Sequence, residues 1–325
     1  MSNNKSLDIQ RTHGAILACC FAIMLCCASS ANAHAEDFNP PWSKPAVSGA
    51  AFTVPGVDNA PDFHGDINHP DLTVFFAGNQ YMVVNKLLTA FLKSHPRYQH
   101  IFVETLPPGI LARQVKKGGL VMGNMRIALH PDVFAAGHGR IRTLKQRGWF
   151  LATADYARNR LAIMTYKGNP LHIRDWKDLA RPGVRLCMPN PQTEGIAAHA
   201  IIPALMHAGG KVLEQAIYAS KVQQGETQLT RIHHRQTPLA IMRKQCDAGA
   251  VWFTEAWFHS HILHHPIGMV TLPGNQNHEV TYAAGIMRDA PHVRAARAFL
   301  RFLTSTKGQA IYRHYGFLPV KALKQ

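Results

Sequence analysis

The sequence predicts an α/β fold, in which helices flank mixed, mostly parallel β-sheets. Short apolar runs rich in valine, isoleucine and phenylalanine recur between residues 72 and 287, and such runs are typical of buried strands. Segments with apolar residues at helical spacing alternate with them, which is the pattern of strands connected through helices. Glycine, proline or asparagine stands at many of the junctions, where the chain turns. The 325 residues suffice for one large or two medium domains.

Residues 1–33 are predicted to be a secretory signal. Lys5 and Arg11 precede an apolar run from Ala15 to Ala28, and Ala31-Asn-Ala33 has the small-x-small pattern of a cleavage site. The run is too short for a membrane span, which needs roughly twenty residues. We therefore expect cleavage after Ala33 and export to the periplasm.

Residues 34–69 are predicted to form an extended N-terminal arm. This stretch is rich in proline, glycine, asparagine and aspartate, and its scattered aromatic residues follow neither the period of a strand nor that of a helix. We expect the arm to lie over the globular body through those aromatic side chains.

The first regular elements are a strand, a glycine turn and a helix. Leu72–Ala77 is an apolar run that predicts a buried strand, and Gly78 allows a sharp turn. From Tyr81 onward apolar residues recur at helical spacing, with Asn79 placed as the N-cap. Such a corner directs free N–H groups and the helix dipole beyond the strand end. It is therefore the candidate floor of a binding site.

The rest of the chain continues the alternation. Further strands or short apolar runs are expected at Ile101–Glu104, Leu120–Met122, Asp132–Phe134, Leu161–Tyr166, Val184–Met188, Ala250–Phe253 and Val280–Met287. Further helices are expected from Ile110, through Ile141–Lys145 to a stop at Gly148, and at Asp175–Leu179, Ile196–Ala208, Pro238–Lys244, Pro291–Thr304 and Thr306–Tyr315.

The composition narrows the class of partner. The formal net charge is +16, which suits anionic ligands or anionic surfaces, although solubility alone explains it equally well. The chain has no dense lysine and arginine run and no recognisable nucleic-acid module, so we expect no nucleic-acid partner. Four of the six cysteines fall in the predicted signal. Cys187 and Cys246 remain, and export would permit them to pair.

No sequence motif indicates an enzyme or a cofactor. The chain lacks a G-x-S-x-G elbow, a P-loop and a dinucleotide-binding G-x-G-x-x-G. Its 20 histidines include His233, His234 and a cluster from His259 to His265, but their spacing matches no established metal motif. We interpret these histidines as polar surface segments and expect neither a catalytic site nor a resident metal.

Four stretches carry a family resemblance. They are Leu72–Asn79, Ile110–Val115, Asp175–Ala180 through Pro189–Ile196, and Phe299–Leu303 with Gly308–Phe317. Together they resemble the type 2 periplasmic solute-binding proteins, closest to the molybdate and tungstate binders, over about Leu72 to Leu318. The resemblance implies two lobes joined by two crossing strands near 161–166 and 282–287, with ligand between the lobes. Lobe 1 would comprise residues 70–155 and 288–325, and lobe 2 residues 156–287.

The resemblance also implies contact positions in lobe 1. Asn79, with Gln80 beside it, stands where the molybdate binders have a serine. Pro108 and Gly109 stand where those proteins have serines in the second loop. Two hydroxyl donors are thereby lost, but backbone N–H groups at the helix starts can still hold an anion.

In lobe 2 the resemblance places Thr193 and Glu194 beside the ligand. Glu194 also has a purely structural interpretation, because acidic residues favour the first turn of a helix. Arg158 and Arg160 are the candidate cations that would offset the charge of Glu194, or else partners in an interlobe salt bridge. Trp252, Thr254 and Glu255 end a strand, where open α/β sheets bind ligands, although Trp252 fits the core equally well.

The predicted function is that of a periplasmic solute-binding component of an ABC importer. Such a protein is expected to be a monomer that closes on a small solute and delivers it to a membrane permease. The first candidate solute is an oxyanion such as molybdate or tungstate. The alternatives are a metal ion, a metal complex, a small organic solute, or a receptor role that feeds a sensor.

Overall fold

The structure is a computed structural model that describes residues 50–52, 61–122, 124–231 and 235–320. The chain divides into two compact units, Met1–Ser43 and Lys44–Gln325, and every described residue belongs to the second. The predicted signal, most of the predicted arm, and His233 and His234 lie outside the described residues.

The described residues form two main sheets and a hairpin. The larger sheet has the order β1 (Ala50–Phe52), β2 (Asp62–Gly65), β4 (Ile101–Leu106), β3 (Leu72–Ala77), β7 (Val133–Gly137), β14 (Val280–Met287) and β8 (Phe150–Asn159). The smaller has the order β11 (Thr227–Leu229), β10 (Leu186–Met188), β12 (Ala248–Trp252), β9 (Leu161–Tyr166) and β13 (Ile267–Thr271). Strands β5 (Leu120–Met122) and β6 (Met125–Ile127) form the hairpin. We call the larger sheet with its helices lobe 1 and the smaller with its helices lobe 2.

The pairing within each sheet is mixed. Strand β3 runs parallel to β4 and β7, and β10 runs parallel to β11 and β12, whereas the remaining pairs are antiparallel. The predicted α/β class is confirmed, and parallel pairing is confined to these two groups. The antiparallel strands are β1 and β2 at one edge of the larger sheet and β13 at one edge of the smaller, together with β8, β9 and β14, which adjoin the segments that pass between the lobes. The carboxyl ends of each parallel group meet at one edge of its sheet, and helices begin there.

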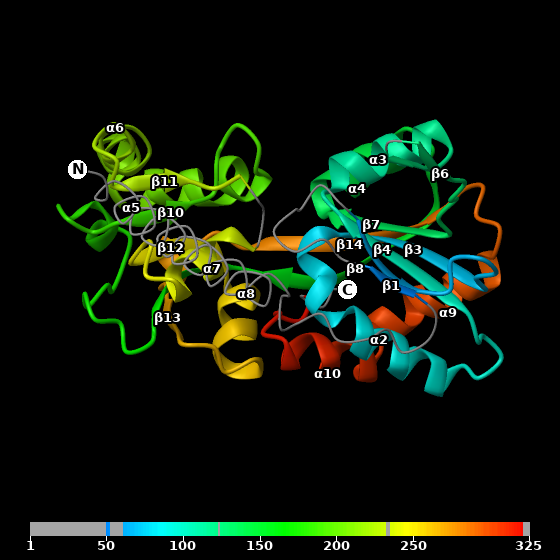
Figure 1. The fold of residues 1–325 in the computed structure, drawn as a ribbon. Helices are drawn as coiled ribbons and strands as arrows, with labels where there is room; N and C mark the ends of the chain where they lie inside the picture. Colours follow the sequence, from blue (N-terminus) through cyan, green and yellow to red (C-terminus); the bar gives the residue numbers. More distant parts are fainter. Residues whose placement is uncertain (1–49, 53–60, 123, 232–234, 321–325) are drawn as a thin grey trace, which may run out of the picture. The chain divides into compact units, whose positions relative to one another are not determined.

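Helices flank both sheets. Lobe 1 contains α2 (Tyr81–Ser94), α3 (Pro108–Lys117), α4 (His138–Gln146), α9 (Val293–Thr304) and α10 (Thr306–His314). Lobe 2 contains α5 (Ile202–Gln215), α6 (Lys221–Gln223), α7 (Gln236–Met242) and α8 (Phe253–Trp257), together with short 3₁₀ and π turns, among them η3 (Lys177–Ala180) and η6 (Phe258–Ile262). In lobe 1, α3 and α4 cover one face of the sheet, and α2, α9 and α10 cover the other (Figure 1).

The core of lobe 1 explains why its central strand is so apolar. Every residue of β3 is buried, and Phe75 and Phe76 are fully enclosed. On α2, Phe91 packs against Phe299 and Phe302 of α9, with ring centroids 5.2 and 5.5 Å apart. Each large apolar side chain buried in this way stabilises the fold by about 1.5–3 kcal/mol.

Two strands were missed by the sequence analysis. Strands β1 and β2 lie within the predicted arm, and they form one edge of the lobe 1 sheet by antiparallel pairing of β2 with β4. Their runs of three and four residues are too short to establish a period. The described part of the arm is thus a structural part of lobe 1.

The two crossing segments are short. Strand β8 of lobe 1 is separated from β9 of lobe 2 only by Arg160. On the return path, the Asn277 side chain accepts a hydrogen bond from the Leu161 backbone N–H at 2.8 Å and donates one to the Leu161 carbonyl at 2.9 Å. Asn277 therefore ties the two crossing segments together beside the point where the chain enters lobe 2.

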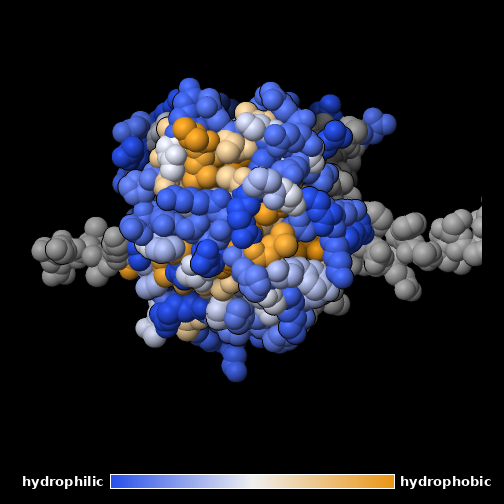
Figure 2. Space-filling view, turned by 90° about the vertical axis from the view of Figure 1, so that its left-hand side faces the viewer, coloured by the Kyte–Doolittle hydropathy of each residue, from blue (hydrophilic) through white to orange (hydrophobic). Residues whose placement is uncertain are grey.

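The described surface is mainly hydrophilic on the face shown in Figure 2, with apolar side chains in small patches. The exposed large apolar residues of the described chain are Leu151, Leu171, Met206 and Val212. Among the described residues, no helix combines the length and apolarity that a membrane crossing requires.

Candidate functional site

The loop between β3 and α2 differs from its prediction. Asn79 is not the N-cap of α2, because residues Gly78–Gln80 form a 3₁₀ turn and Gln80 occupies the cap position without a side-chain cap bond. The Asn79 side-chain amide instead donates to the hydroxyl of Tyr282 on β14. Gln80 is fully buried, its Nε2 lies 3.4 Å from Asn79 Oδ1, and its Oε1 has no hydrogen-bond partner among the described residues. Two amides from this loop therefore lie at the root of the crossing strand.

A buried polar network continues from this loop into lobe 2. The Asn159 side chain lies beside the Tyr282 hydroxyl, and its Nδ2 donates to the Thr254 hydroxyl at 2.9 Å. Burial is the main reason that the pKa of Tyr282 is raised, and the charge of the buried Glu255 carboxyl adds to the effect. We call Asn79, Tyr282, Asn159 and Thr254 the junction network, because it joins the first loop of lobe 1 to the start of α8 through both crossing segments.

The junction network brings together predicted and unpredicted residues. Asn79 and Thr254 were predicted from the sequence, and Glu255 lies within electrostatic range of the network. Tyr282 and Asn159 were missed as site residues. Both lie in the segments that connect the lobes, so a polar residue at a predicted crossing was the signal that could have identified them.

Arg160 stacks on an aromatic ring instead of forming the interlobe salt bridge. Its guanidinium carbon lies 3.8 Å from the ring centroid of Phe253, which is a cation–π contact. Burial lowers the pKa of Arg160, and the charge of Glu279 opposes that effect. Its neighbour Arg158 has Nη1 2.6 Å from Glu279 Oε2, but Glu279 directly precedes β14, the strand that pairs with β8, so this ion pair is not an interlobe salt bridge.

A second buried contact joins the lobes and was not predicted. Arg235, immediately before α7, forms an ion pair with Asp62 of β2, and both side chains are almost completely buried. Asp62 Oδ2 also accepts a hydrogen bond from the Thr105 hydroxyl at 2.9 Å. The Arg235 guanidinium carbon lies 5.6 Å from the Tyr81 ring centroid, at the start of α2. A buried cation thus stands next to the first loop.

The other predicted residues of lobe 2 have mainly structural contacts. Glu194 is buried and accepts hydrogen bonds from the Asn190 backbone N–H and the Thr230 hydroxyl, which joins the loops after β10 and β11. Thr193 is exposed. Trp252 belongs to the lobe 2 hydrophobic core, although it keeps 8% of its surface exposed.

Gly109 keeps its predicted place at the start of a helix. It is the second residue of α3, after Pro108, as expected for a proline at a helix N-terminus. A Cβ atom on Gly109 would meet only the Arg113 side chain, at 3.9 Å. The helix start is therefore sterically open, and its backbone N–H groups point beyond the carboxyl end of β4.

The histidine cluster shows no metal site. Among the described residues, no group of three or more histidine, cysteine, aspartate or glutamate side chains is placed to hold a metal ion. The surface interpretation is right for His261 and His264 but wrong for His259, which is fully buried with its Nδ1 2.9 Å from that of His265. Burial lowers the pKa of His259 to about 3, so it is neutral at physiological pH.

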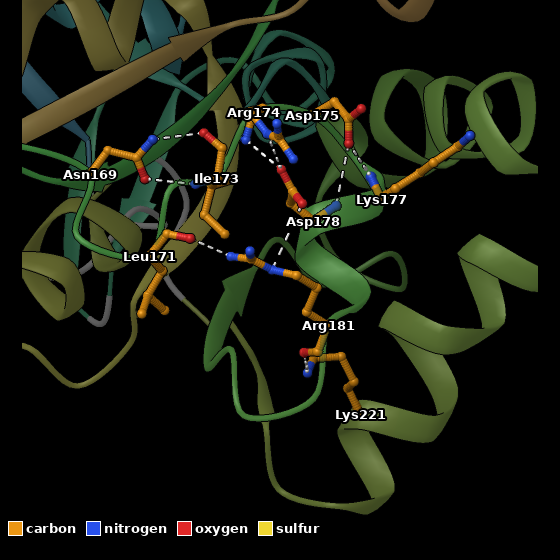
Figure 3. A network of polar contacts seen from close by, with 9 residues as sticks. All are labelled: Asn169, Leu171, Ile173, Arg174, Asp175, Lys177, Asp178, Arg181 and Lys221. Carbon is orange, nitrogen blue, oxygen red and sulfur yellow. Dashed lines mark hydrogen bonds and ion pairs between the residues drawn. The ribbon is translucent and has the colours of Figure 1, made fainter.

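A separate polar network stabilises the opposite edge of lobe 2 (Figure 3). Asp178 accepts from the Arg174 backbone N–H at 2.7 Å, and Lys221 Nζ donates to the Arg181 carbonyl at 2.8 Å. The loop that contains Arg174, Asp178 and Arg181 follows the carboxyl end of β9, which is antiparallel to β12. This loop therefore lies at the amino edge of the parallel strands, away from the edge where the helices begin. Its polar contacts hold the loop in place and are not part of the candidate site.

The fold has counterparts among solved structures. The sulfate-binding protein of Mycobacterium tuberculosis superposes with a TM-score of 0.62 at 21% identity, covering 78% of this chain and 88% of that protein. The periplasmic molybdate-binding protein of Azotobacter vinelandii superposes with a TM-score of 0.61 at 19% identity, covering 77% of this chain and all of that protein, 100%. These likenesses confirm the predicted two-lobe α/β fold.

Sequence comparison agrees with this fold. A sulfate-binding protein of Synechococcus elongatus is 27% identical over 177 residues, which cover 49% of this chain and 46% of the relative. The chain thus spans about half the length of that curated relative. Residues 72–318 match the family described as bacterial extracellular solute-binding protein. Since the match covers most of the chain, the protein belongs to the bacterial extracellular solute-binding protein family.

Proposed function

We propose that the protein is the periplasmic solute-binding component of an ABC importer, and that it holds a small oxyanion between its two lobes without altering it chemically. The observation that carries this proposal is the junction network, in which buried polar groups from both lobes meet at the crossing segments beside the start of α2. A site shared between two lobes that are joined by short segments fits a binding protein that closes on its solute.

The chemistry of the junction favours an anion. The 3₁₀ turn Gly78–Gln80 and Gly109 in the first turn of α3 lie at the positive ends of helix dipoles, where backbone N–H groups can hold an anion. Asn79 and Gln80 add amide groups. The net charge of +16 attracts anions to the whole molecule.

Sulfate and molybdate are both first candidates. The curated relatives are named as sulfate- and thiosulfate-binding proteins, whereas one of the similar structures is a molybdate-binding protein. All of these solutes are small tetrahedral oxyanions, which accept hydrogen bonds from amide and backbone donors. A metal solute has less support, because the described residues contain no cluster that fits a metal ion.

Calorimetry and thermal melting would test the proposal. Sulfate, thiosulfate, molybdate, tungstate and phosphate would be titrated separately, with chloride as the ionic-strength control. We expect one of the tetrahedral anions to bind and to raise the melting temperature. If none of the five anions produces a heat of binding or a shift in the melting temperature, the proposal that the protein binds an oxyanion is refuted.

A matched pair of variants locates the site. Asn79→Asp replaces a buried amide donor by a carboxylate at the junction, so it should abolish anion binding. Gln192→Glu introduces the same charge at an exposed position of lobe 2 and should leave the affinity unchanged. A separate experiment distinguishes transport from sensing. A strain that lacks this protein should lose uptake of the bound anion if the protein serves an importer, and should keep it if the protein serves only a sensor.

A further inference from the structure

The ion pair between Asp62 and Arg235 connects the two lobes directly. Asp62 lies on β2 at the edge of the lobe 1 sheet, and Arg235 lies in the loop between β11 and α7 of lobe 2. The exposed fractions of the two side chains are only 7% and 3%, so the pair is shielded from solvent. Shielding matters here because exposed ion pairs contribute little, whereas breaking a buried one leaves an uncompensated charge.

Asp62 is held rigidly from the side of lobe 1. It stands opposite Thr105 in the β2–β4 register, and the Thr105 hydroxyl donates to it at 2.9 Å. Its neighbour Phe63 packs on Phe102, with ring centroids 5.4 Å apart. The carboxylate is therefore a fixed point of lobe 1.

Arg235 contacts the Asp62 carboxylate from lobe 2. Its guanidinium also lies over the ring of Tyr81, the first residue of α2, with 5.6 Å between guanidinium carbon and ring centroid. Tyr81 in turn packs edge-on against Phe258 of lobe 2, with ring centroids 5.9 Å apart. Charge and aromatic contacts thus join the same two surfaces.

Strand β2 lies outside the part of the chain that matches the family. That match begins at residue 72, so Asp62 comes from a segment preceding it. The contact therefore involves a residue outside the matched part of the chain.

We propose that Asp62 and Arg235 form an interlobe latch that sets solute affinity by stabilising the closed arrangement of the lobes. The latch rests on the proposed function, because it assumes that the lobes close on a solute. A contact made only when the lobes touch contributes free energy to the closed state alone, and so it shifts the open–closed population. Asp62 and Arg235 are positioning residues in this role.

Two single variants and their combination test the latch. Asp62→Asn and Arg235→Gln each remove one charge, and the double variant removes the pair. We expect each single variant to weaken binding of the anion identified by calorimetry by about tenfold or more. The double variant should lose much less than the product of the two single losses, because both act through one contact.

The matched control is an ion pair within one lobe. Arg185 Nη2 lies 2.7 Å from Asp247 Oδ1, and both residues belong to lobe 2. Asp247→Asn should lower the melting temperature without changing anion affinity. A merely structural role for Asp62 would make Asp62→Asn behave in the same way.

Small-angle X-ray scattering of the ligand-free proteins gives an independent measurement. The radius of gyration should increase in Asp62→Asn and Arg235→Gln but not in Asp247→Asn. Circular dichroism shows whether each variant is folded. If Asp62→Asn does not fold, Arg235→Gln alone provides the test of the latch.

The outcomes are distinguishable. Unchanged affinity and an unchanged radius of gyration in both latch variants would overturn the latch. Tighter anion binding by Asp62→Asn would also overturn it, since Asp62 would then compete with the solute for Arg235. If the wild-type protein binds none of the oxyanions, the oxyanion proposal fails, while the scattering experiment still decides the latch.

Discussion

Asn79 donates a side-chain hydrogen bond to the hydroxyl of Tyr282, although 203 residues separate them in the chain. The bond joins the first loop of lobe 1 to the strand that returns from lobe 2. Because Asn159 also lies beside this hydroxyl, the loop and both crossing segments meet at one place. This position makes the hydroxyl a sensitive point for stability and for binding.

Replacing Tyr282 by phenylalanine should therefore destabilise the protein. The variant keeps the ring but leaves the buried amides of Asn79 and Asn159 without this hydroxyl, which costs about 1–3 kcal/mol. Urea denaturation would measure the change in unfolding free energy. Tyr98→Phe, at a half-buried surface position, is the control and should change it little. A Tyr282→Phe variant as stable as the wild type would contradict the importance of the network.

Glu104 should make stability depend on pH. This carboxyl lies fully buried on β4. Its Oε1 accepts a hydrogen bond from Gln114 Nε2 at 2.9 Å, and its Oε2 has no hydrogen-bond partner in the described part of the chain. Burial raises the pKa of Glu104 to about 7, so the folded state binds a proton more tightly than the unfolded state. Stability should therefore fall by roughly 3 kcal/mol as the pH rises from the unfolded-state pKa to about 7.

Glu104→Gln removes this titration. We expect the unfolding free energy of the variant to be flatter between pH 5 and pH 8, and to exceed that of the wild type at pH 8. Urea denaturation at both pH values is the measurement. An identical pH profile in the two proteins would show that another group dominates.

Gly249 should not tolerate a side chain. It lies in β12, where a Cβ atom would be 2.3 Å from the Cys187 carbonyl oxygen and 2.6 Å from Thr237 Cγ2. Gly249→Ala should therefore separate β12 from β10 and α7 and destabilise the protein by about 1–3 kcal/mol. Gly274→Ala, where nothing lies within 4 Å of the added atom, is the control. Thermal melting of both variants checks the difference.

The two cysteines should be protected in the native protein. Cys187 and Cys246 are free, buried thiols, and the neighbouring Cys187 thiol together with burial raises the pKa of Cys246. We expect thiol reagents to modify neither in the native state and both after unfolding, because the thiolate is the reactive form. If both react after unfolding only when a reductant is added, the isolated protein contains a disulfide instead.

The main strands could be predicted because burial dictates their composition. Leu72–Ala77 and Leu161–Tyr166 coincide with β3 and β9, since strands buried on both faces are continuously apolar. The helix predicted to end at Ala208 does end there, because Gly209 and Gly210 have non-helical backbone angles, and a second helical segment then runs to Gln215. A pair of glycines is a reliable local signal for the end of a helix.

The site was less predictable because it depends on contacts between distant residues. Nothing local to Asp62 or Arg235 indicates that they pair across 173 residues. Asn79 was expected to cap α2, but its amide bonds Tyr282 instead. Side-chain direction is decided by tertiary packing, and residue spacing carries no information on it.

The path of the chain has a consequence for folding order. Strand β8 lies at the edge of its sheet with β14 as its neighbour, and Val280 pairs with Asn159 across the whole of lobe 2. During synthesis, the backbone N–H and C=O groups of β8 lack their β14 partners until the lobe 2 sequence has been made. Lobe 2 is continuous and can form first. Completion of lobe 1 is therefore a late step, and the nascent protein needs protection from aggregation during that interval.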